Sequence, residues 1–350
     1  MTDIWRSFIA QRISWANGWS VLFHEATVWQ ERNEHDLLKD FEDEIPGYMN
    51  NTKIALALAA LLTLPLPAVR AADNPLIGTV WSGTGEAVAD ETVEEAVRAA
   101  DYVLIGEIHD NPEHHAIQAR LIRAMTEAGR QPAVVFEMVP RGLQSELDDF
   151  EAEGSRDVAG LGQRLKWEER GWPNWSTYQP IAEAALAAHL SLYAGDLDRE
   201  TIRAIGKGER PFEPAAAYSD AMRENLAEEL RISHCDLLPD EAIGPMIKVQ
   251  QARDTAMATA MLDYGVEDGA VLISGSGHAR KDRGVPFVLA AREPGRYVVS
   301  IGLMEVRDGA TEFSDYPDEG ETALPFDFVM FTARANDIDH CAALKKQMGK

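Results

Sequence analysis

The pattern of apolar and polar residues from about residue 76 onward alternates between short apolar runs and longer segments with apolar residues at helical spacing. Short runs bounded by turn residues predict buried strands, and the longer segments predict helices that cover them. The predicted strands are 77–81, 102–107, 132–137, 190–194, 270–274, 297–303 and 326–331. The predicted helices are 91–100, 112–129, 180–189, 215–230 and 240–264.

The unit from residue 102 to residue 137 has the order strand, helix, strand. Asp110 and Asn111 offer a side-chain cap for the helix, and Pro112 suits its first turn. Such a unit implies parallel strands joined by a right-handed crossover. We therefore expect an α/β fold with a parallel-rich sheet flanked by helices, and a smaller helical subdomain inserted at about 141–188.

A different pattern occupies the first 71 residues. Lys53 precedes an uncharged apolar run, 54–69, which is shorter than the ~20 residues of a membrane-spanning helix. Small residues at Val69 and Ala71 then suit signal peptidase, so 49–71 is interpreted as a secretory signal peptide rather than an uncleaved membrane anchor. Residues 1–48 are accordingly interpreted as a mis-assigned extension, and the mature α/β domain as 72–350. No lipobox cysteine lies near the cleavage site, and we expect a periplasmic or secreted protein.

Composition and charge limit the classes of function that this chain can have. Apolar residues make up 45% of the chain and charged residues 26%, which is typical of a globular protein. The net charge of −25, from 33 basic and 58 acidic residues, repels phosphate backbones and argues against general nucleic-acid binding. Export would permit a disulfide between the two cysteines, Cys235 and Cys341; two separate buried thiols are the alternative.

Four polar residues lie at or just beyond the ends of predicted strands. Glu107 and Glu137 end two of the strands, His109 follows Glu107 by two residues, and His278 follows the strand at 270–274. Because the carboxyl ends of parallel strands converge on one crevice, we expect these four side chains around one pocket. Carboxylates and imidazoles ligate metals or transfer protons. Burial and mutual repulsion should raise the pKa of at least one carboxylate.

Neighbouring basic residues leave alternatives open. Arg280 or Arg283 could pair with the two glutamates and return them to a structural role. His114 and His115 fall in the first turn of the helix after Pro112, where the helix dipole opposes a cation, so both should be neutral. We expect one of them to face the crevice and the other to lie on the surface.

An aromatic segment follows at 166–180. Its tryptophans and tyrosine suit either a small hydrophobic core, which the physics alone favours, or a flat apolar ligand. No Cys-x-x-Cys-His motif occurs, which excludes covalent c-type haem. Arg164 and Arg170 flank the segment and are candidates to bind an anionic ligand.

Five sequence runs together carry a family resemblance: GEIHDNPEHH at 106–115, VFEM at 135–138, GWPNW at 171–175, QQARD at 250–254 and GSGH at 275–278. They resemble the ChaN-like haem-binding proteins, a family that belongs to a wider group with the Tiki metalloproteases and erythromycin esterases. The resemblance covers about residues 76–345. Many members of that family are lipoproteins, and this sequence departs from them in lacking a lipobox.

The resemblance implies an exported protein that binds non-covalent haem in haem or iron uptake. It implies side-chain haem ligands with tyrosine on the iron, a homodimer, and a membrane haem-uptake system as partner. Tyr178 is the first choice for the iron ligand and Tyr193 the second. The other residues assigned to the haem site are Trp172, Trp175, His109 and His278.

The wider group implies an alternative, a metal-dependent hydrolase acting as a peptidase or esterase. In that case Glu107, His109, Glu137 and His278 would hold a divalent metal ion and be the catalytic residues. The binding protein is the preferred hypothesis, and no catalytic residue is asserted under it.

Overall fold

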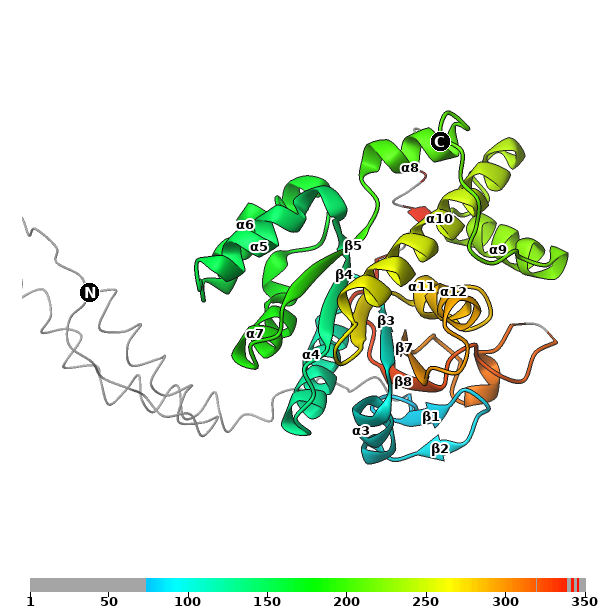
Figure 1. Cartoon of the computed structure of the whole chain (residues 1–350). Helices are drawn as coiled ribbons and strands as arrows, with labels where there is room; N and C mark the ends of the chain where they lie inside the picture. Colours follow the sequence, from blue (N-terminus) through cyan, green and yellow to red (C-terminus); the bar gives the residue numbers. More distant parts are fainter. Residues whose placement is uncertain (1–73, 319, 339–340, 343–344, 346–350) are drawn as a thin grey trace, which may run out of the picture. The chain divides into compact units, whose positions relative to one another are not determined.

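The computed structural model describes residues 74–318, 320–338, 341–342 and 345, and these form an α/β domain around one sheet (Figure 1). The strand order is β2-β1-β8-β7-β3-β6-β4-β5. The strands are β1 (Val80–Ser82), β2 (Ala87–Val88), β3 (Tyr102–Glu107), β4 (Ala133–Pro140), β5 (Leu192–Asp196), β6 (Ala270–Gly275), β7 (Val298–Glu305) and β8 (Phe328–Thr332). From β8 to β5 all neighbours pair in parallel, whereas β1 is antiparallel to β2 and β8. The expected parallel-rich fold is confirmed.

Helices cover both faces of this sheet. They are α3 (Asp90–Ala99), α4 (Pro112–Glu127), α5 (Gln144–Ala152), α6 (Val158–Arg164), α7 (Gln179–Ala187), α8 (Arg199–Gly206), α9 (Asp220–Ser233), α10 (Asp240–Tyr264), α11 (Ser276–Ala279) and α12 (Val285–Arg292). Short 3-10 turns are η1 (Arg141–Leu143), η2 (Glu168–Arg170), η3 (Trp175–Thr177) and η4 (Phe313–Asp315). Between β4 and β5 the chain is helical, in the region where the smaller helical part was expected.

Alternation along β3 shows how one strand serves two cores. Val103 and Ile105 pack with residues of α3, α4 and α7 on one face. Tyr102 and Leu104 pack with residues of α10 and α12 on the other. A strand buried on both faces must be apolar at nearly every position, and this is why the run at 102–107 is readable from sequence.

The start of α4 fixes the chain that leaves β3. The Asn111 side chain accepts a hydrogen bond from the Glu113 backbone N–H at 2.9 Å, and Pro112 occupies the first turn. Asn111 also donates to Glu305 at the end of β7. The loop from 108 to 111 is therefore held at the carboxyl edge of the sheet.

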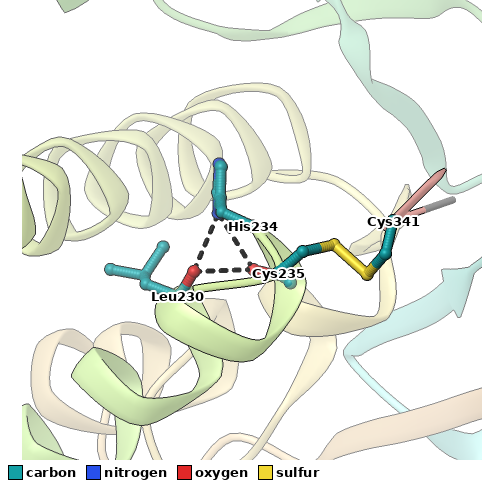
Figure 2. Close-up of a disulfide and its surroundings, with 5 residues drawn as sticks. Leu230, His234, Cys235 and Cys341 are labelled. Atoms are coloured by element: carbon teal, nitrogen blue, oxygen red, sulfur yellow. Dashed lines mark hydrogen bonds between the residues drawn. A yellow bond between two sulfur atoms is a disulfide. The ribbon is translucent and has the colours of Figure 1, made fainter. Parts of the chain in front are cut away.

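The predicted disulfide is confirmed. Cys235 follows the end of α9 and bonds to Cys341, with the two Cα atoms 5.6 Å apart (Figure 2). The His234 ring lies 2.8 Å from the Leu230 carbonyl beside it. The bond joins the α9 region to the segment that follows β8.

The predicted extension and signal peptide, 1–48 and 49–71, lie outside the described residues. Within the part of the chain that is described, no helix is both long enough and apolar enough to cross a membrane. Cleavage and export remain predictions.

Candidate functional site

The carboxyl ends of β3, β4 and β6 meet at one place, as the sequence pattern predicted. Glu107 at the end of β3 is in register with Gly275 at the end of β6. The Gly275 backbone N–H donates to Glu137 Oε2 at 2.7 Å, which joins β4 to the same edge. His278 follows in α11. The structure therefore brings Glu107, Glu137 and His278 together from three neighbouring strands.

Glu107 is the centre of the first group of contacts. Its carboxylate is buried and accepts hydrogen bonds from the Tyr178 hydroxyl at 2.5 Å and from His109 Nδ1 at 2.9 Å. His115 Nε2 lies 3.4 Å from the other carboxylate oxygen. Burial alone would raise the pKa of Glu107, but His109 and His115 outweigh it and lower the pKa to about 2. Glu107 is thus an ionised carboxylate at neutral pH.

Tyr178 donates its phenolic proton to that carboxylate. The side chain is fully buried, and its hydroxyl lies 2.5 Å from Glu107 Oε1 and 3.1 Å from the His109 carbonyl. Burial, reinforced by the negative charge of Glu107, raises its pKa far above the usual value. A tyrosinate at this position would face the anionic Glu107 carboxylate. Tyr178 is a hydrogen-bond donor in this arrangement, and its assignment as an iron ligand stays a prediction.

Glu137 belongs to a second group, held by an arginine. Arg253 of α10 places Nη2 2.6 Å from Glu137 Oε1 and 2.7 Å from Asp196 Oδ2. Burial would raise the pKa of Glu137, but His278 and Arg253 hold it well below the usual range. The predicted partner, Arg283, pairs with Glu229 instead. The other predicted partner, Arg280, is ion-paired with Asp282.

The expected rise in carboxylate pKa is therefore wrong for both predicted glutamates. Each buried glutamate has cationic or hydrogen-bonding partners that stabilise its charged form more than burial penalises it. The carboxylate with a raised pKa is Asp254, where burial is the largest cause. Asp254 lies next to Arg253 in the QQARD run. This run was noticed in the sequence, but it does not follow a predicted strand, so its two charged residues were not assigned to the site.

His278 is buried between two carboxylates. Its Nδ1 lies 2.6 Å from Asp254 Oδ1 and its Nε2 3.4 Å from Glu137 Oε1. Burial lowers the pKa of His278, but Glu137 and Asp254 overcome this and raise it to about 10. His278 therefore bridges Glu137 and Asp254 as a cation between two carboxylates.

The two histidines of α4 are both buried. His114 Nδ1 accepts the Ile108 backbone N–H at 2.9 Å, and its Nε2 lies 2.8 Å from Thr332 Oγ1. Burial lowers the pKa of His114 to about 4, so the ring is neutral as expected. The His115 ring packs on Tyr178 with centroids 3.8 Å apart. The surface position expected for one of the two is wrong, because both rings support the loop after β3.

The aromatic segment divides into core and surface. Trp175 is buried with Trp167, and its indole N–H donates to the Val158 carbonyl at 2.7 Å. Trp172 is half-buried and contacts His109 edge-on, with ring centroids 4.9 Å apart. Tyr193 lies elsewhere on β5, stacked on Tyr264 at the end of α10. Of the predicted aromatic residues, Tyr178 and Trp172 lie at the Glu107 group, and Trp172 is the partly exposed one of the two.

The flanking arginines have other partners. Arg164 is ion-paired with the exposed Glu153. Arg170 donates to the Leu165 carbonyl at 2.9 Å and to the Met138 carbonyl at 2.5 Å, and burial lowers its pKa to about 10. Arg170 therefore supports the aromatic segment from within.

His109 is the accessible member of the predicted four. Its side chain is 33% exposed, whereas those of Glu107, Glu137 and His278 are almost fully buried. Burial lowers the pKa of His109, but the hydrogen bond to Glu107 raises it overall. A Cβ added at Gly275 would lie 3.1 Å from His109 Nε2, so this nitrogen packs closely against the glycine backbone.

Metal binding by the four residues finds no support. In the described ranges, no group of three or more His, Cys, Asp or Glu side chains is arranged to hold a metal ion. Glu107 Oε1 accepts from Tyr178, Glu137 Oε1 accepts from Arg253, and His278 Nδ1 contacts Asp254, whereas Glu107 Oε2 is buried with no hydrogen-bond partner.

Comparison with known proteins agrees with this architecture. ChaN of Campylobacter jejuni, solved with cofacial haem, has 21% identity and a TM-score of 0.59, covering 72% of this chain and 95% of that one. The type III effector HopBA1 has 12% identity and a TM-score of 0.40, covering 75% and 99%. A mutant of erythromycin esterase EreC in its open conformation has 15% identity and a TM-score of 0.39, covering 71% and 79%.

Family models and curated proteins complete the comparison. No curated protein matches the chain. A model of the STELLO glycosyltransferases matches residues 1–60, outside the described residues. The family model described as haem-binding uptake, Tiki superfamily, ChaN matches residues 93–289, which is more than half of the chain and runs from within α3 to within α12. The chain therefore belongs to the ChaN haem-binding uptake family of the Tiki superfamily.

Proposed function

We propose that this protein binds non-covalent haem and serves in haem uptake outside the cytoplasm. Family membership supports the ligand class, and the related ChaN of Campylobacter jejuni is a haem-bound protein of the same fold. The Cys235–Cys341 disulfide supports an oxidising compartment, as the signal-peptide pattern also does. A homodimer and a membrane uptake system as partners are part of the same proposal.

The assignment of the binding site depends on one observation: the buried carboxylate of Glu107 pairs with the accessible imidazole of His109. Glu107 holds His109 through Nδ1 at 2.9 Å, and the His109 side chain, whose Nε2 lies beside Gly275, is 33% exposed. A carboxylate on one ring nitrogen fixes the ring and makes the other nitrogen a better metal ligand. Imidazole is a common axial ligand of haem iron. We assign His109 Nε2 as the iron ligand.

The surrounding residues fit a flat apolar ligand. Trp172 presents its edge to the His109 ring and leaves part of its own surface exposed. Haem, when bound, would supply an iron that can accept such a nitrogen. Tyr178 donates a hydrogen bond to the same Glu107 carboxylate, and this bond keeps the carboxylate charged and oriented.

Spectroscopic titration tests this assignment. The purified protein is titrated with ferric haem at pH 7, and the Soret band gives the affinity. His109→Ala is expected to weaken haem binding by about tenfold or more. A tenfold change corresponds to ~1.4 kcal/mol, and the lost bond to iron should contribute more than that. His189→Asn is the control, since His189 is an exposed histidine whose left-handed backbone asparagine tolerates.

The tyrosine alternatives are resolved by the same titration. Tyr178→Phe and Tyr193→Phe are expected to keep the wild-type absorption spectrum. If the wild-type haem spectrum is lost in one of these variants but kept in His109→Ala, that tyrosine is the iron ligand instead. A wild-type protein without a Soret shift would refute haem binding as a whole.

Export is tested separately by the intact mass of the protein recovered outside the cytoplasm. We expect a chain that starts near Ala72. A mature protein that still contains residues 5–29 would contradict cleavage at this site.

A further inference from the structure

A cavity of about 540 Å³ lies at the carboxyl end of β7, beside the start of α11 and the segment before β8. Its volume is within the ~300–1,000 Å³ of small-molecule pockets. His109, Glu107 and Glu137 are absent from its lining. The cavity is therefore a second candidate site, separate from the group of residues around Glu107.

One wall of the cavity is apolar and firmly packed. Leu324 and Phe326 line the cavity, and both are buried in the hydrophobic core that also contains residues of α10 and α12. Leu303, near the end of β7, adds to the same lining. Because core packing fixes these side chains, an apolar part of a ligand would meet a preformed surface.

The charged side chains of the lining are of both signs. Arg334 pairs with Asp308 at 3.3 Å. Arg280 lies 3.7 Å from Glu229 and 3.8 Å from Asp318. These ion pairs account for all but one acid and one arginine of the lining, whose charged members are Glu229, Arg280, Glu305, Arg307, Asp308, Asp318 and Arg334. The acid and the arginine that remain are Glu305 and Arg307.

Glu305 is a fixed carboxylate without a cationic partner. In the described part of the chain it forms no ion pair, and both of its hydrogen bonds reach the same oxygen. Asn111 Nδ2 and the Ala335 backbone N–H each lie 2.8 Å from Oε1. These two bonds orient the carboxylate and leave Oε2 for a ligand. A protonated amine is the group that would bind it by a charge-assisted hydrogen bond.

Arg307, two residues further along the chain, is the cation without an acidic partner. Its guanidinium lies over the Tyr316 ring, 4.6 Å from the centroid, and its Nη2 donates to the Asp315 backbone carbonyl. No carboxylate among the described residues forms an ion pair with it. A guanidinium has five N–H donors, so donors remain for the carboxylate of a ligand.

We propose that this cavity binds a zwitterion with an apolar side chain, either a free α-amino acid or a short peptide. Its ammonium group contacts Glu305, its carboxylate contacts Arg307, and its apolar side chain packs on Leu324 and Phe326. A ligand with one charge of each sign matches the two unpaired groups, whereas a dianion would leave a negative charge facing Glu305. The proposal does not depend on haem binding at His109.

Three related probes separate the two charges in calorimetric titrations. L-phenylalanine has both charges, its amide has the ammonium group alone, and its N-acetyl derivative has the carboxylate alone. Each probe is titrated at pH 7 into the wild type, Glu305→Gln and Arg307→Gln. Glutamine at position 305 keeps the oxygen that accepts from Asn111 and Ala335, and urea unfolding checks that each variant is folded.

The matched controls are Arg334→Gln and Asp318→Asn. Both residues line the same cavity, but each already has an ion-pair partner. Their variants are therefore expected to bind L-phenylalanine with wild-type affinity.

The two test variants should lose affinity for different probes. Glu305→Gln is expected to bind L-phenylalanine and its amide about tenfold or more weakly, because a charge-assisted hydrogen bond is lost, and to bind the N-acetyl derivative as the wild type does. Arg307→Gln should weaken binding of L-phenylalanine and the N-acetyl derivative by a similar factor and leave that of the amide unchanged. The dipeptide phenylalanyl-leucine distinguishes the sources: tighter binding than L-phenylalanine assigns the site to peptides, and weaker binding assigns it to free amino acids.

Three outcomes would overturn the proposal. A wild type that binds neither L-phenylalanine nor the dipeptide has no such site. Equal losses for all three probes in both variants would give Glu305 and Arg307 a structural role. Unchanged affinities in both variants would place the ligand elsewhere on the protein.

Discussion

Replacing Arg253 with methionine should reveal how strongly the site depends on one buried cation. Arg253 contacts Glu137 at 2.6 Å and Asp196 at 2.7 Å, with both carboxylate side chains less than a tenth exposed. Methionine keeps most of the apolar stem, so the loss is mainly that of charge. Removing one partner of a buried ion pair typically costs about 3–5 kcal/mol, and we expect that loss in the free energy of unfolding at pH 7.

The loss should depend on pH in a defined direction. The folded pKa of Glu137 is held well below its ordinary value of 4.5, so Glu137 contributes stability above that pH. The contribution is lost as the pH falls through the folded pKa. Without Arg253 the folded pKa of Glu137 rises, and protonation relieves the uncompensated charge. The difference between wild type and variant should therefore be smaller at pH 4 than at pH 7.

Urea unfolding followed by circular dichroism measures both effects. The matched control is Arg296→Met, because Arg296 also pairs with two carboxylates, at 3.2 and 3.1 Å, but its side chain is 52% exposed. Exposed pairs are worth about 0–1 kcal/mol, so the control should lose little. Equal losses for the two variants, or a loss for Arg253→Met that is the same at both pH values, would refute the electrostatic reasoning.

Three further changes test other parts of the structure by urea unfolding. Replacing Cys235 and Cys341 by serine opens a loop with a sequence separation of 106 and should cost up to ~5 kcal/mol, whereas an unchanged midpoint would contradict the bond. Tyr178→Phe removes a donor to ionised Glu107 and should cost ~1.5–3 kcal/mol at pH 7; a loss below this would mean that water replaces the hydroxyl. Gly106→Ala places a Cβ 2.7 Å from the first Cα of α11 and should cost ~1–3 kcal/mol, and a neutral result would show that α11 can move.

The sequence predicted the central strands and the long helix well. The strand at 102–107 and the helix at 240–264 have the predicted bounds. Both are long or fully buried elements, in which the apolar pattern is set by burial on one or both sides. The edge of the sheet was less clear: the strand expected at 77–81 begins at Val80, because Asn74 and Thr79 form a turn around Leu76. Short edge strands have too few residues for a pattern to define their start.

The candidate site was predicted in position but not in chemistry. The rule that parallel strand ends converge correctly brought Glu107, His109, Glu137 and His278 together. It gave no information on their partners, because Arg253 reaches Glu137 from a residue 116 positions away in sequence. Ionisation depends on such tertiary contacts, and so the expected rise in the pKa of at least one of these two glutamates was wrong.

Burial explains why His109 and Tyr178 differ, although both fall in family-like sequence and both contact Glu107. The Tyr178 hydroxyl has one proton, and it donates that proton to Glu107 from a fully buried position. His109 has two ring nitrogens, so one binds Glu107 while the other lies beside Gly275 on a side chain that is 33% exposed. The same carboxylate thus holds the phenol as a donor and fixes the imidazole ring, whose second nitrogen is the proposed ligand. This difference between the two residues follows from their side-chain chemistry and from which of them is exposed to solvent. A sequence pattern specifies the chemistry but not the exposure.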